Sequence, residues 1–484
     1  MSILNQLKPE VVWRIFEEIC QVPRPSKKED KIIEYLLNWA KEHHIEAKRD
    51  EIGNVLMRKP ATKGKENVKS VVLQSHMDMV CEKNNDVDFN FETDAIVPRI
   101  DGEWVKATGT TLGADDGIGM ATQMAILIST DISHGPIEAL FTVDEETGLT
   151  GAFALQSNFF NSEILINLDS EDEGELFIGC AGGIDTLATF DFEQEPVPEG
   201  HKAFKIDIKG LNGGHSGDEI DKGYGNANKI LTRILWNSDK FDLKLAHIDG
   251  GNLRNAIARE AVAIVTVKKD SVNEFKAYFE QFGKDVKAEL QTTEKNLEII
   301  LSETEMPSFV IDENTQYNLI NALYACPHGV IEMSRDMKNM VETSTNLASV
   351  KLNKDKKEIL ISTSQRSSVD SSKHDIASMV ESVFILAGAK VKHSDGYPGW
   401  TPNTKSEIMK IASDSYEKIF QIKPIVRSIH AGLECGLFLE KYPDLDMISF
   451  GPTLRAVHSP DERINIETVD KFWKHLIDVL ESIK

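Results

Sequence analysis

The sequence predicts an α/β protein in which a mostly parallel sheet domain is interrupted by an inserted α+β domain. Apolar strand-like segments alternate with helical segments near both ends of the chain, as in a parallel sheet covered on both faces. Near residue 185 this pattern changes to paired strands with single helices between them. A length of 484 residues also exceeds what one ordinary core organises. We therefore expect the main domain in two parts, residues 1–185 and 394–484, with the insertion at residues 186–393.

The first part of the main domain is expected to begin with two helices and to continue as alternating strands and helices. Apolar residues recur at helical spacing over 10–21 and 27–43, and the run Pro23-Arg24-Pro25-Ser26 separates the two segments. A helix expected at 115–130 is apolar on most faces, which is typical of a buried crossover helix. The strands expected in this part cover residues 68–75, 137–143 and 163–168.

The pattern of the insertion predicts a ferredoxin-like unit that occurs twice. Residues 201–304 follow the order strand, helix, strand, strand, helix, strand, which defines that unit. A similar order recurs over residues 307–392, beginning with a strand at 308–311, although no convincing sequence repeat underlies it. The pattern of the main domain then resumes with a helix at 404–420, a strand at 445–450 and a helix at 467–483.

Charge and cysteine content argue against several classes of function. The formal net charge of −24 disfavours nucleic acid and anionic membranes as partners, because both require a basic protein surface. Five cysteines without a Cys-x-x-Cys pair indicate neither a disulfide framework nor a thiolate metal site. No apolar run reaches the roughly 18 residues that span a bilayer, and residues 1–9 lack the features of a signal peptide. We therefore expect a cytoplasmic protein.

Histidines and carboxylates follow several of the expected strands, at the points where those strands end. In an open α/β sheet the carboxyl ends of the strands gather along one edge, where binding sites form. Each residue alone has an ordinary explanation, such as helix capping for the acidic pair at 115–116 or turn formation for a loop aspartate. Their convergence on one edge makes a metal site the leading hypothesis. The residues concerned are His76, Asp78, Asp115, Asp116, Glu145, Glu146, Asp169 and His458.

The ligand types in this set indicate which metal chemistry to expect. Nitrogen and oxygen donors without thiolate suit Zn²⁺, Co²⁺ or Mn²⁺. Two histidines and several carboxylates exceed the needs of one tetrahedral ion, whereas two ions about 3.5–4 Å apart with a shared carboxylate would use them all. Asp78 lies two residues after His76 and can hydrogen-bond its ring. Of the adjacent pair Glu145 and Glu146, one carboxylate can bind metal while the other accepts a proton from metal-bound water.

Five motifs in this chain occur in the order found in a known enzyme family. The chain resembles the co-catalytic dizinc metallopeptidases, which include carnosinase, aminoacylase, tripeptidase T and the glutamate carboxypeptidases. The long insertion and the segments 213–217, 250–257 and 430–436 resemble the branch of that family that cleaves dipeptides. The five motifs are His76-Met77-Asp78, Gly113-Ala114-Asp115-Asp116-Gly117, Asp144-Glu145-Glu146-Thr147-Gly148, Asn167-Leu168-Asp169 and Val457-His458-Ser459-Pro460.

The resemblance implies a role for each residue of the site. Asp115 would bridge two divalent ions, most simply Zn²⁺, with Co²⁺ or Mn²⁺ as alternatives. His76 and Asp169 would complete one metal site, and Glu146 and His458 the other. Asp78 would orient His76, Glu145 would be the general base, and the peptide between Asp115 and Asp116 would be cis.

The resemblance also implies a function and a role for the insertion. It implies metal-dependent hydrolysis of unblocked dipeptides, including those that end in histidine. The insertion would act as a lid, supply substrate-binding residues and form a homodimer. An acyl-removing amidohydrolase or a tripeptidase is the alternative. An inactive metal- or peptide-binding relative is disfavoured, because Glu145 and all five ligands are present.

Three residues of the insertion resemble substrate-binding residues of relatives. His215, in a glycine-rich loop, would stabilise the oxyanion that forms during hydrolysis, unless it is simply a surface turn residue. Arg366 and Asn255 would bind the substrate, since the planar arginine fork suits a carboxylate. Arg254 and Arg259 are alternative choices for this role.

Overall fold

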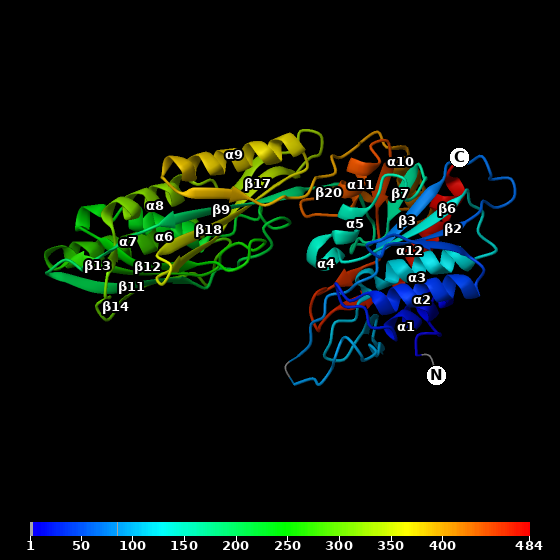
Figure 1. Cartoon of the computed structure of the whole chain (residues 1–484), viewed down its shortest axis with the longest axis horizontal. Helices are drawn as coiled ribbons and strands as arrows, with labels where there is room; N and C mark the ends of the chain where they lie inside the picture. Colours follow the sequence, from blue (N-terminus) through cyan, green and yellow to red (C-terminus); the bar gives the residue numbers. More distant parts are fainter. Residues whose placement is uncertain (1–2, 85) are drawn as a thin grey trace. The chain divides into compact units, whose positions relative to one another are not determined.

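The computed structural model describes residues 3–84 and 86–484, and the chain divides into two compact units (Figure 1). Unit 2 consists of Ala181–Gly399 and Ile429–Gly432, and unit 1 consists of the chain before, between and after these segments. The divisions fall after Cys180 and Gly399, whereas the sequence placed them after residues 185 and 393. The segment Ile429–Gly432, which the sequence placed in the main domain, belongs to unit 2.

Unit 1 is built on an eight-stranded sheet with the order β1-β2-β6-β3-β7-β21-β8-β20 (Figure 1). The four central strands β6, β3, β7 and β21 run parallel to one another. Every residue of β3 and β6 is buried, as expected for central strands of a parallel sheet that is covered on both faces. The strands are β1 (Glu46–Arg49), β2 (Val55–Lys59), β3 (Val71–His76), β6 (Ile137–Thr142), β7 (Ile164–Asn167), β8 (Glu175–Cys180), β20 (Ile425–Ile429) and β21 (Asp446–Ser449).

The helices of unit 1 pack on this sheet through apolar faces. Helix α3 packs on β3 and β6 and is covered by α1, while α10 packs on β21 and β8 and pairs with α12. Side chains of Ser406 and Asn465 cap α10 and α12 by accepting N–H bonds from the first turn. The helices are α1 (Glu10–Cys20), α2 (Asp30–Glu42), α3 (Ala114–Ile128), α4 (Glu145–Gly148), α5 (Thr150–Ala154), α10 (Glu407–Phe420), α11 (Cys435–Lys441) and α12 (Ile466–Ser482).

The predicted fold class of the main domain is confirmed. Every helix and strand expected at 10–43, 68–168 and 404–483 is present, with ends displaced by a few residues. The sequence missed β1, β2, β8 and β20, which widen the sheet at its two edges. It also missed a small sheet with the order β22-β23-β5-β4, formed by β4 (Arg99–Asp101), β5 (Trp104–Lys106), β22 (Leu454–Arg455) and β23 (Arg463–Asn465).

Unit 2 contains a nine-stranded antiparallel sheet that joins two modules of ferredoxin-like order. The first module, β11-α6-β12-β13-α7-β14, follows the pattern predicted over 201–304, and its strands lie in the order β14-β11-β13-β12. The second module supplies β17-β18-β9-β19 to the same sheet. The modules meet where β12 pairs antiparallel with β17, at Asp249 with Lys351 and Gly250 with Val350.

The expected start of the second module was wrong. The sequence began it with a strand at 308–311, but that segment is β15 (Val310–Ile311), which pairs only with β10 (Gln194–Glu195). The first strand of the module is β9 (Gly182–Asp191), which pairs with β18 along its whole length. The first module is therefore inserted between β9 and α8. Local periodicity could not show this, because pairing partners far apart in the chain decide it.

The remaining elements of unit 2 have these bounds. Strands are β11 (His201–Lys209), β12 (Lys244–Gly250), β13 (Ala261–Lys268), β14 (Glu298–Glu303), β16 (Gly329–Met333), β17 (Val341–Asn353), β18 (Glu358–Ser367) and β19 (Lys390–His393). Helices are α6 (Ala227–Trp236), α7 (Val272–Glu289), α8 (Glu313–Ala325) and α9 (Asp370–Leu386), with short 3-10 turns at Asp239–Phe241 and Lys269–Ser271.

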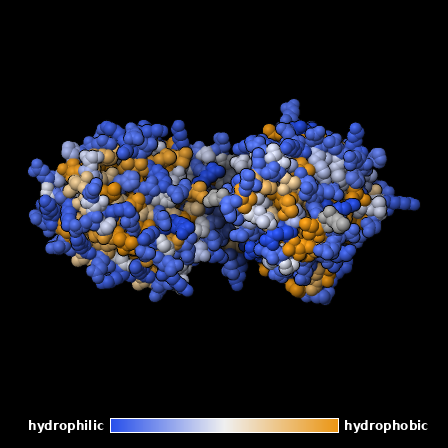
Figure 2. All heavy atoms as spheres, turned by 90° about the horizontal axis from the view of Figure 1, so that it is seen from below, coloured by the Kyte–Doolittle hydropathy of each residue, from blue (hydrophilic) through white to orange (hydrophobic). Residues whose placement is uncertain are grey.

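Each unit has its own hydrophobic core. Phe16 and Phe141 are fully buried in unit 1, and Phe204, Phe275 and Phe384 in unit 2. On the face drawn in Figure 2, hydrophilic residues predominate and hydrophobic residues gather only in small patches. Among the described helices, none has the length and apolar character needed to cross a membrane.

Candidate metal centre

The predicted ligands of unit 1 gather at the carboxyl ends of its central strands. His76 is the last residue of β3, Asp169 follows β7, and Glu145 and Glu146 open the short helix α4 after β6. Asp115 lies at the start of α3. These segments are far apart in the sequence, but strand order places β6, β3 and β7 side by side.

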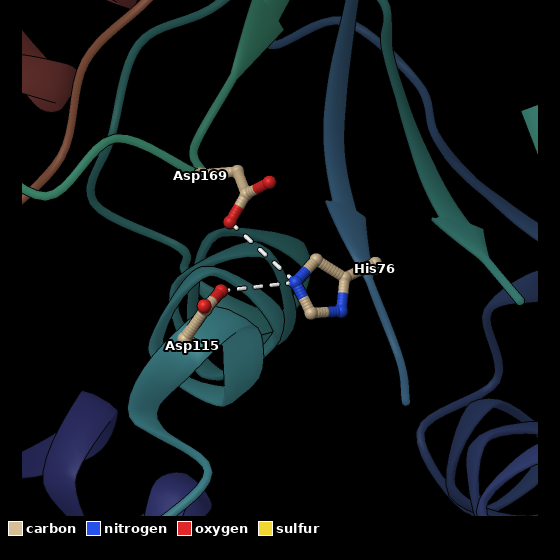
Figure 3. A group of neighbouring side chains, drawn as sticks. All are labelled: His76, Asp115 and Asp169. Atoms are coloured by element: carbon tan, nitrogen blue, oxygen red, sulfur yellow. Dashed lines mark hydrogen bonds and ion pairs between the residues drawn. The ribbon is translucent and has the colours of Figure 1, made fainter. Parts of the chain in front are cut away.

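A first group consists of His76, Asp115 and Asp169 (Figure 3). The Nε2 atom of His76 lies 3.0 Å from Asp115 Oδ1 and 3.6 Å from Asp169 Oδ1. The other ring nitrogen, Nδ1, lies 3.4 Å from Asp78 Oδ1. The imidazole therefore directs one nitrogen at two carboxylates and the other at the aspartate expected to orient it.

A second group consists of Asp115, Glu146 and His458. His458 lies on the loop between β22 and β23, and its Nε2 atom is 3.2 Å from Asp115 Oδ2 and 3.0 Å from Glu146 Oε2. Asp115 thus directs Oδ1 at His76 and Oδ2 at His458. A carboxylate that divides its two oxygens in this way has the geometry of a bridging ligand.

The residues present fit a pair of divalent cations. In each group the donor atoms lie within 4.8 Å of one another, and all of them are nitrogen or carboxylate oxygen. Burial, together with the neighbouring Asp115 carboxylate, raises the pKa of Asp169 to about 7. Glu146 Oε1 is buried and has no hydrogen-bond partner within residues 3–84 and 86–484. Crowded negative charge and an unpartnered buried oxygen are both features that bound cations would satisfy.

Asp78 connects the first group to the two glutamates. Its Oδ1 accepts the Glu145 N–H at 3.0 Å, and its Oδ2 accepts the Glu146 N–H at 3.3 Å and the Ser26 hydroxyl at 2.7 Å. Asp78 is fully buried, so these bonds fix both its carboxylate and the backbone of α4. The spacing of His76 and Asp78 predicted that they lie close together, but among the described residues His76 Nδ1 has no hydrogen-bond partner, so the expected bond between them stays a prediction. The role of Ser26 had no signal in the sequence.

Glu145 belongs to neither of these two groups but forms a further cluster of possible ligand atoms with His76 and Glu146. One oxygen of Glu145 lies within 4.8 Å of donor atoms of His76 and Glu146. Burial is the main cause that raises the pKa of Glu145 well above its ordinary value, although the nearby His76 opposes the shift. A carboxylate with an elevated pKa is suited to accept and release a proton near neutral pH.

A buried hydrogen-bond network crosses the sheet below these ligands, and sequence reasoning missed it. Glu434 Oε2 accepts from Gln74 Nε2 at 2.6 Å and from Thr142 Oγ1 at 2.8 Å. Gln74 Oε1 accepts from Asn167 Nδ2 at 2.6 Å, and Asn167 Oδ1 accepts from the Ser449 hydroxyl. The network links all four parallel strands close to their carboxyl ends. Gln74 and Asn167 are polar residues that follow apolar residues in buried strands, and this pattern is the sequence signal that could have indicated the network.

In unit 2, His215 is held as a neutral imidazole with a defined tautomer. The N–H groups of Gly217 and Asp218 donate to its Nδ1 at 3.3 and 3.2 Å, which leaves the ring proton on Nε2. Burial, with the positive charge of Arg366, lowers the pKa of His215. His215 can therefore donate a hydrogen bond through Nε2.

Arg366 and His430 lie in the same region of unit 2, and sequence reasoning gave no role to His430. Arg366 Nη1 donates to the Tyr397 hydroxyl at 3.0 Å, and Arg366 Nε is buried without a hydrogen-bond partner among the described residues. His430 Nε2 lies 2.8 Å from the Ser344 hydroxyl, and burial, with Arg366 and His215 nearby, lowers the pKa of His430 to about 3. The positive charge of Arg366 therefore lies near two histidine rings whose pKa values are lowered.

The other predicted substrate residues differ in their surroundings. Asn255 is exposed, and its carbonyl accepts the Ser216 N–H at 2.9 Å, so its backbone supports the loop of His215. Arg254 forms an ion pair with Asp185 at 2.8 Å. Arg259 packs with its alkyl chain against Gly213. Arg366 is the most buried of the three arginines.

The chain is similar to known proteins over nearly its whole length. Residues 72–482 match the model of peptidase family M20/M25/M40. The "Cytosol non-specific dipeptidase" of Escherichia coli (strain K12) is 47% identical over 486 residues, covering 100% of this chain and 99% of the relative. These matches confirm the resemblance that the five motifs indicated.

Two solved structures show the same fold. The crystal structure of aminoacylhistidine dipeptidase from Vibrio alginolyticus is 45% identical, with a TM-score of 0.92 over 99% of this chain and 98% of that chain. The structure of a tripeptidase from Staphylococcus aureus is 16% identical, with a TM-score of 0.57 over 98% of each chain. At that identity the second structure supports the fold alone.

Proposed function

The chain belongs to peptidase family M20/M25/M40, and from this premise we propose that it is a metal-dependent dipeptidase. Its substrates are dipeptides with free termini, including those with a C-terminal histidine. The 47% identity over full length to a dipeptidase supports the reaction, and the 45% identity to an aminoacylhistidine dipeptidase supports the histidine-containing substrates. The observation that carries most weight in this chain is the division of the Asp115 oxygens between two ligand groups.

Two divalent ions, which we propose to be Zn²⁺, fit the two groups. His76, Asp115 and Asp169 would hold one ion, and Asp115, Glu146 and His458 would hold the other. When bound, such a pair supplies Lewis acidity that polarises the scissile carbonyl and lowers the pKa of a water molecule. The absence of thiolate from the donor set supports Zn²⁺, Co²⁺ or Mn²⁺ over softer ions.

The side chains around the groups perform the proton transfers. Glu145 takes a proton from the attacking water on a carboxylate oxygen and delivers it to the nitrogen of the leaving amino acid. Burial raises the pKa of Glu145, which makes its carboxylate a stronger base than an exposed glutamate. Asp78 Oδ1 lies 3.4 Å from His76 Nδ1 and accepts the Glu145 backbone N–H, so we propose that it places the base relative to the ligand.

Unit 2 supplies the substrate-binding groups. The Nε2–H of His215 is a donor for the developing oxyanion, and its neutral state follows from the lowered pKa. Arg366 binds the free carboxylate of the dipeptide, because it is a fixed cation with an unsatisfied Nε. Asn255 assists from the loop that carries His215.

Two further properties belong to this proposal, a cytoplasmic location and a homodimer. We place the protein in the cytoplasm, as the name of the Escherichia coli relative indicates for that protein. All five cysteines are free, which accords with a reducing compartment. We also propose a homodimer formed through unit 2.

The test is a panel of substrates assayed on metal-stripped protein with and without added Zn²⁺, Co²⁺ or Mn²⁺. The panel contains β-alanyl-histidine, glycyl-leucine, an N-acetyl amino acid and a tripeptide. Metal-dependent cleavage of the two dipeptides alone is the expected result. Cleavage of only the acetylated compound or the tripeptide would replace the dipeptidase by an amidohydrolase or a tripeptidase. Absence of turnover with every ion would contradict an enzymatic role.

A further inference from the structure

The loop that carries the bridging aspartate is held by a buried carboxylate from a distant part of the chain. Glu462 is 2% exposed, and its two oxygens accept four consecutive backbone N–H groups. Oε2 accepts from Leu112 at 2.7 Å and Gly113 at 2.9 Å, and Oε1 accepts from Ala114 at 2.7 Å and Asp115 at 3.3 Å. The last of these bonds is made to the backbone of the bridging ligand itself.

Glu462 also belongs to the turn that presents His458. The Glu462 N–H donates to Ser459 O at 3.0 Å, and the Ser459 hydroxyl donates to Ala456 O at 2.7 Å. Ala456 and His458 both have positive φ values, 55° and 61°, which are uncommon for residues with side chains. Glu462 therefore ties a tightly folded turn, with His458 on it, to the loop with Asp115.

A buried arginine binds the same loop through its carbonyl groups. Arg24 is 2% exposed, and its Nη2 donates to Gly113 O. Its Nη1 donates to Met77 O at 3.1 Å and Asp78 O at 2.6 Å, in the segment directly after His76. A Cβ atom at Gly113 would lie only 2.6 Å from Arg24 Nη2, so the close approach requires glycine there.

These contacts join three separate ligand-bearing segments. Arg24 links the end of β3, with His76, to the loop of Asp115, and Glu462 links that loop to the turn of His458. Ordinary helix capping of α3 would use one or two N–H groups and would not need a residue 347 positions away in the chain. The contacts of Arg24 and Glu462 instead connect the segment of His76, in the first ligand group, through the loop of Asp115 to the turn of His458, in the second group.

We propose that Arg24 and Glu462 are positioning residues that set the separation of the His76, Asp115 and His458 ligands and so determine the affinity of the two-ion site. This inference rests on the metal-dependent function proposed above. Neither residue touches the donor atoms, so both act through backbone placement. Losing such outer contacts typically weakens metal binding by about 10- to 100-fold.

The test compares Glu462→Gln and Arg24→Lys with the full-length wild-type chain. Glutamine keeps the shape of Glu462 but offers one acceptor oxygen in place of two, and it directs an amide at N–H groups. Lysine keeps the charge of Arg24 but replaces the planar fork, whose Nη1 and Nη2 bond to different segments, by a single compact ammonium group. Asp461→Asn is the matched control, because it removes a charge from the same turn without a bond to the loop.

Metal-stripped proteins are titrated with Co²⁺, and ion stoichiometry, affinity and the visible absorption spectrum are recorded. We expect the weaker-bound Co²⁺ to dissociate about 10- to 100-fold more readily in both variants, with an altered spectrum. The control is expected to match wild type. We also expect kcat for glycyl-leucine to fall while KM changes little. Circular dichroism establishes that each compared variant is folded.

Wild-type Co²⁺ affinity and spectrum in folded Glu462→Gln and Arg24→Lys would overturn the inference. If Glu462→Gln does not fold, Arg24→Lys decides, because it acts on the same loop. Wild-type protein that binds two Co²⁺ ions but cleaves no dipeptide would contradict the proposed function and leave this inference testable by the titration alone. Wild-type protein that binds no ion would overturn both.

Discussion

The buried carboxyl group of Glu434 provides a prediction whose size follows from the structure. Glu434 is 1% exposed, accepts hydrogen bonds from Gln74 and Thr142 on Oε2, and has no partner for Oε1 in the described part of the chain. Burial raises the pKa of Glu434 from 4.5 to about 8. The side chain is therefore a neutral acid in the folded protein at pH 7.

The raised pKa makes folding less favourable as pH rises. Between pH 4.5 and about 8 the unfolded chain has lost the Glu434 proton while the folded chain keeps it. The unfolded state then binds fewer protons, so the free energy of unfolding falls over this interval. At about 1.4 kcal/mol per pKa unit, the loss is on the order of 3–5 kcal/mol.

The variant Glu434→Gln removes this dependence. Glutamine is neutral at every pH and still offers an oxygen to Gln74 and Thr142. We compare the free energy of unfolding of the variant with that of wild type at each pH. The difference, variant minus wild type, is expected to rise by about 3–5 kcal/mol between pH 4.5 and pH 8.5. The assay is amide hydrogen exchange of β3 and β6 in metal-free protein, because exchange there reports unit 1 without requiring both units to unfold together.

A control separates this effect from general pH sensitivity. Glu440 is exposed on helix α11, which begins directly after Glu434, so Glu440→Gln is the matched surface control. Parallel pH dependence in wild type and Glu434→Gln would refute the reasoning, since Glu434 would then ionise in the folded protein as it does in the unfolded chain.

Other predictions address the proposed chemistry. Glu145→Gln is expected to keep fold and bound metal but to lose about 100-fold or more in kcat, and near-normal turnover would remove the general-base role. Asp115→Ala is expected to reduce bound metal to one ion or none by elemental analysis, and two tightly bound ions would show that the bridge is misplaced. His215→Ala is expected to lower kcat with unchanged metal content, and an unaltered kcat would return His215 to a structural role. Adding Zn²⁺ at about 100 times its Kd is expected to stabilise unit 1 by about 2.7 kcal/mol in hydrogen exchange, whereas no change would argue against binding to the folded state.

Sequence patterns were sufficient to predict elements that depend on local periodicity. The apolar runs before His76, Glu145 and Asp169 identified three parallel strands, and the rule that such strands end at one edge brought the three positions together. The division of ligands into two groups that share Asp115 came from the family resemblance, and the distances in unit 1 have that arrangement. The metal roles of these residues remain predictions.

Sequence patterns failed where a residue acts through distant partners. Glu434 lies in the segment 430–436, whose family resemblance gave this residue no role, and its bonds reach β3 and β6 some hundreds of positions earlier. Glu462 was visible only as an acidic residue after His458. Strand β9 was missed as the start of the second module because its partner β18 lies beyond the whole first module. In each case contacts between distant segments of the chain, rather than local periodicity, determine the role of the residue or the place of the strand.

The arrangement of buried charge in unit 1 implies that fold and metal binding depend on each other. Burial leaves Asp169, Glu145 and Asp116 with raised pKa values, which means that the metal-free fold holds carboxyl groups where ionisation is unfavourable. Arg24 and Glu462 impose that crowding through backbone bonds, so the chain cannot relieve it by moving the ligand loops apart. Cations bound between the carboxylates would remove the repulsion without moving the backbone. Loosening either positioning residue should therefore weaken the binding of the ions.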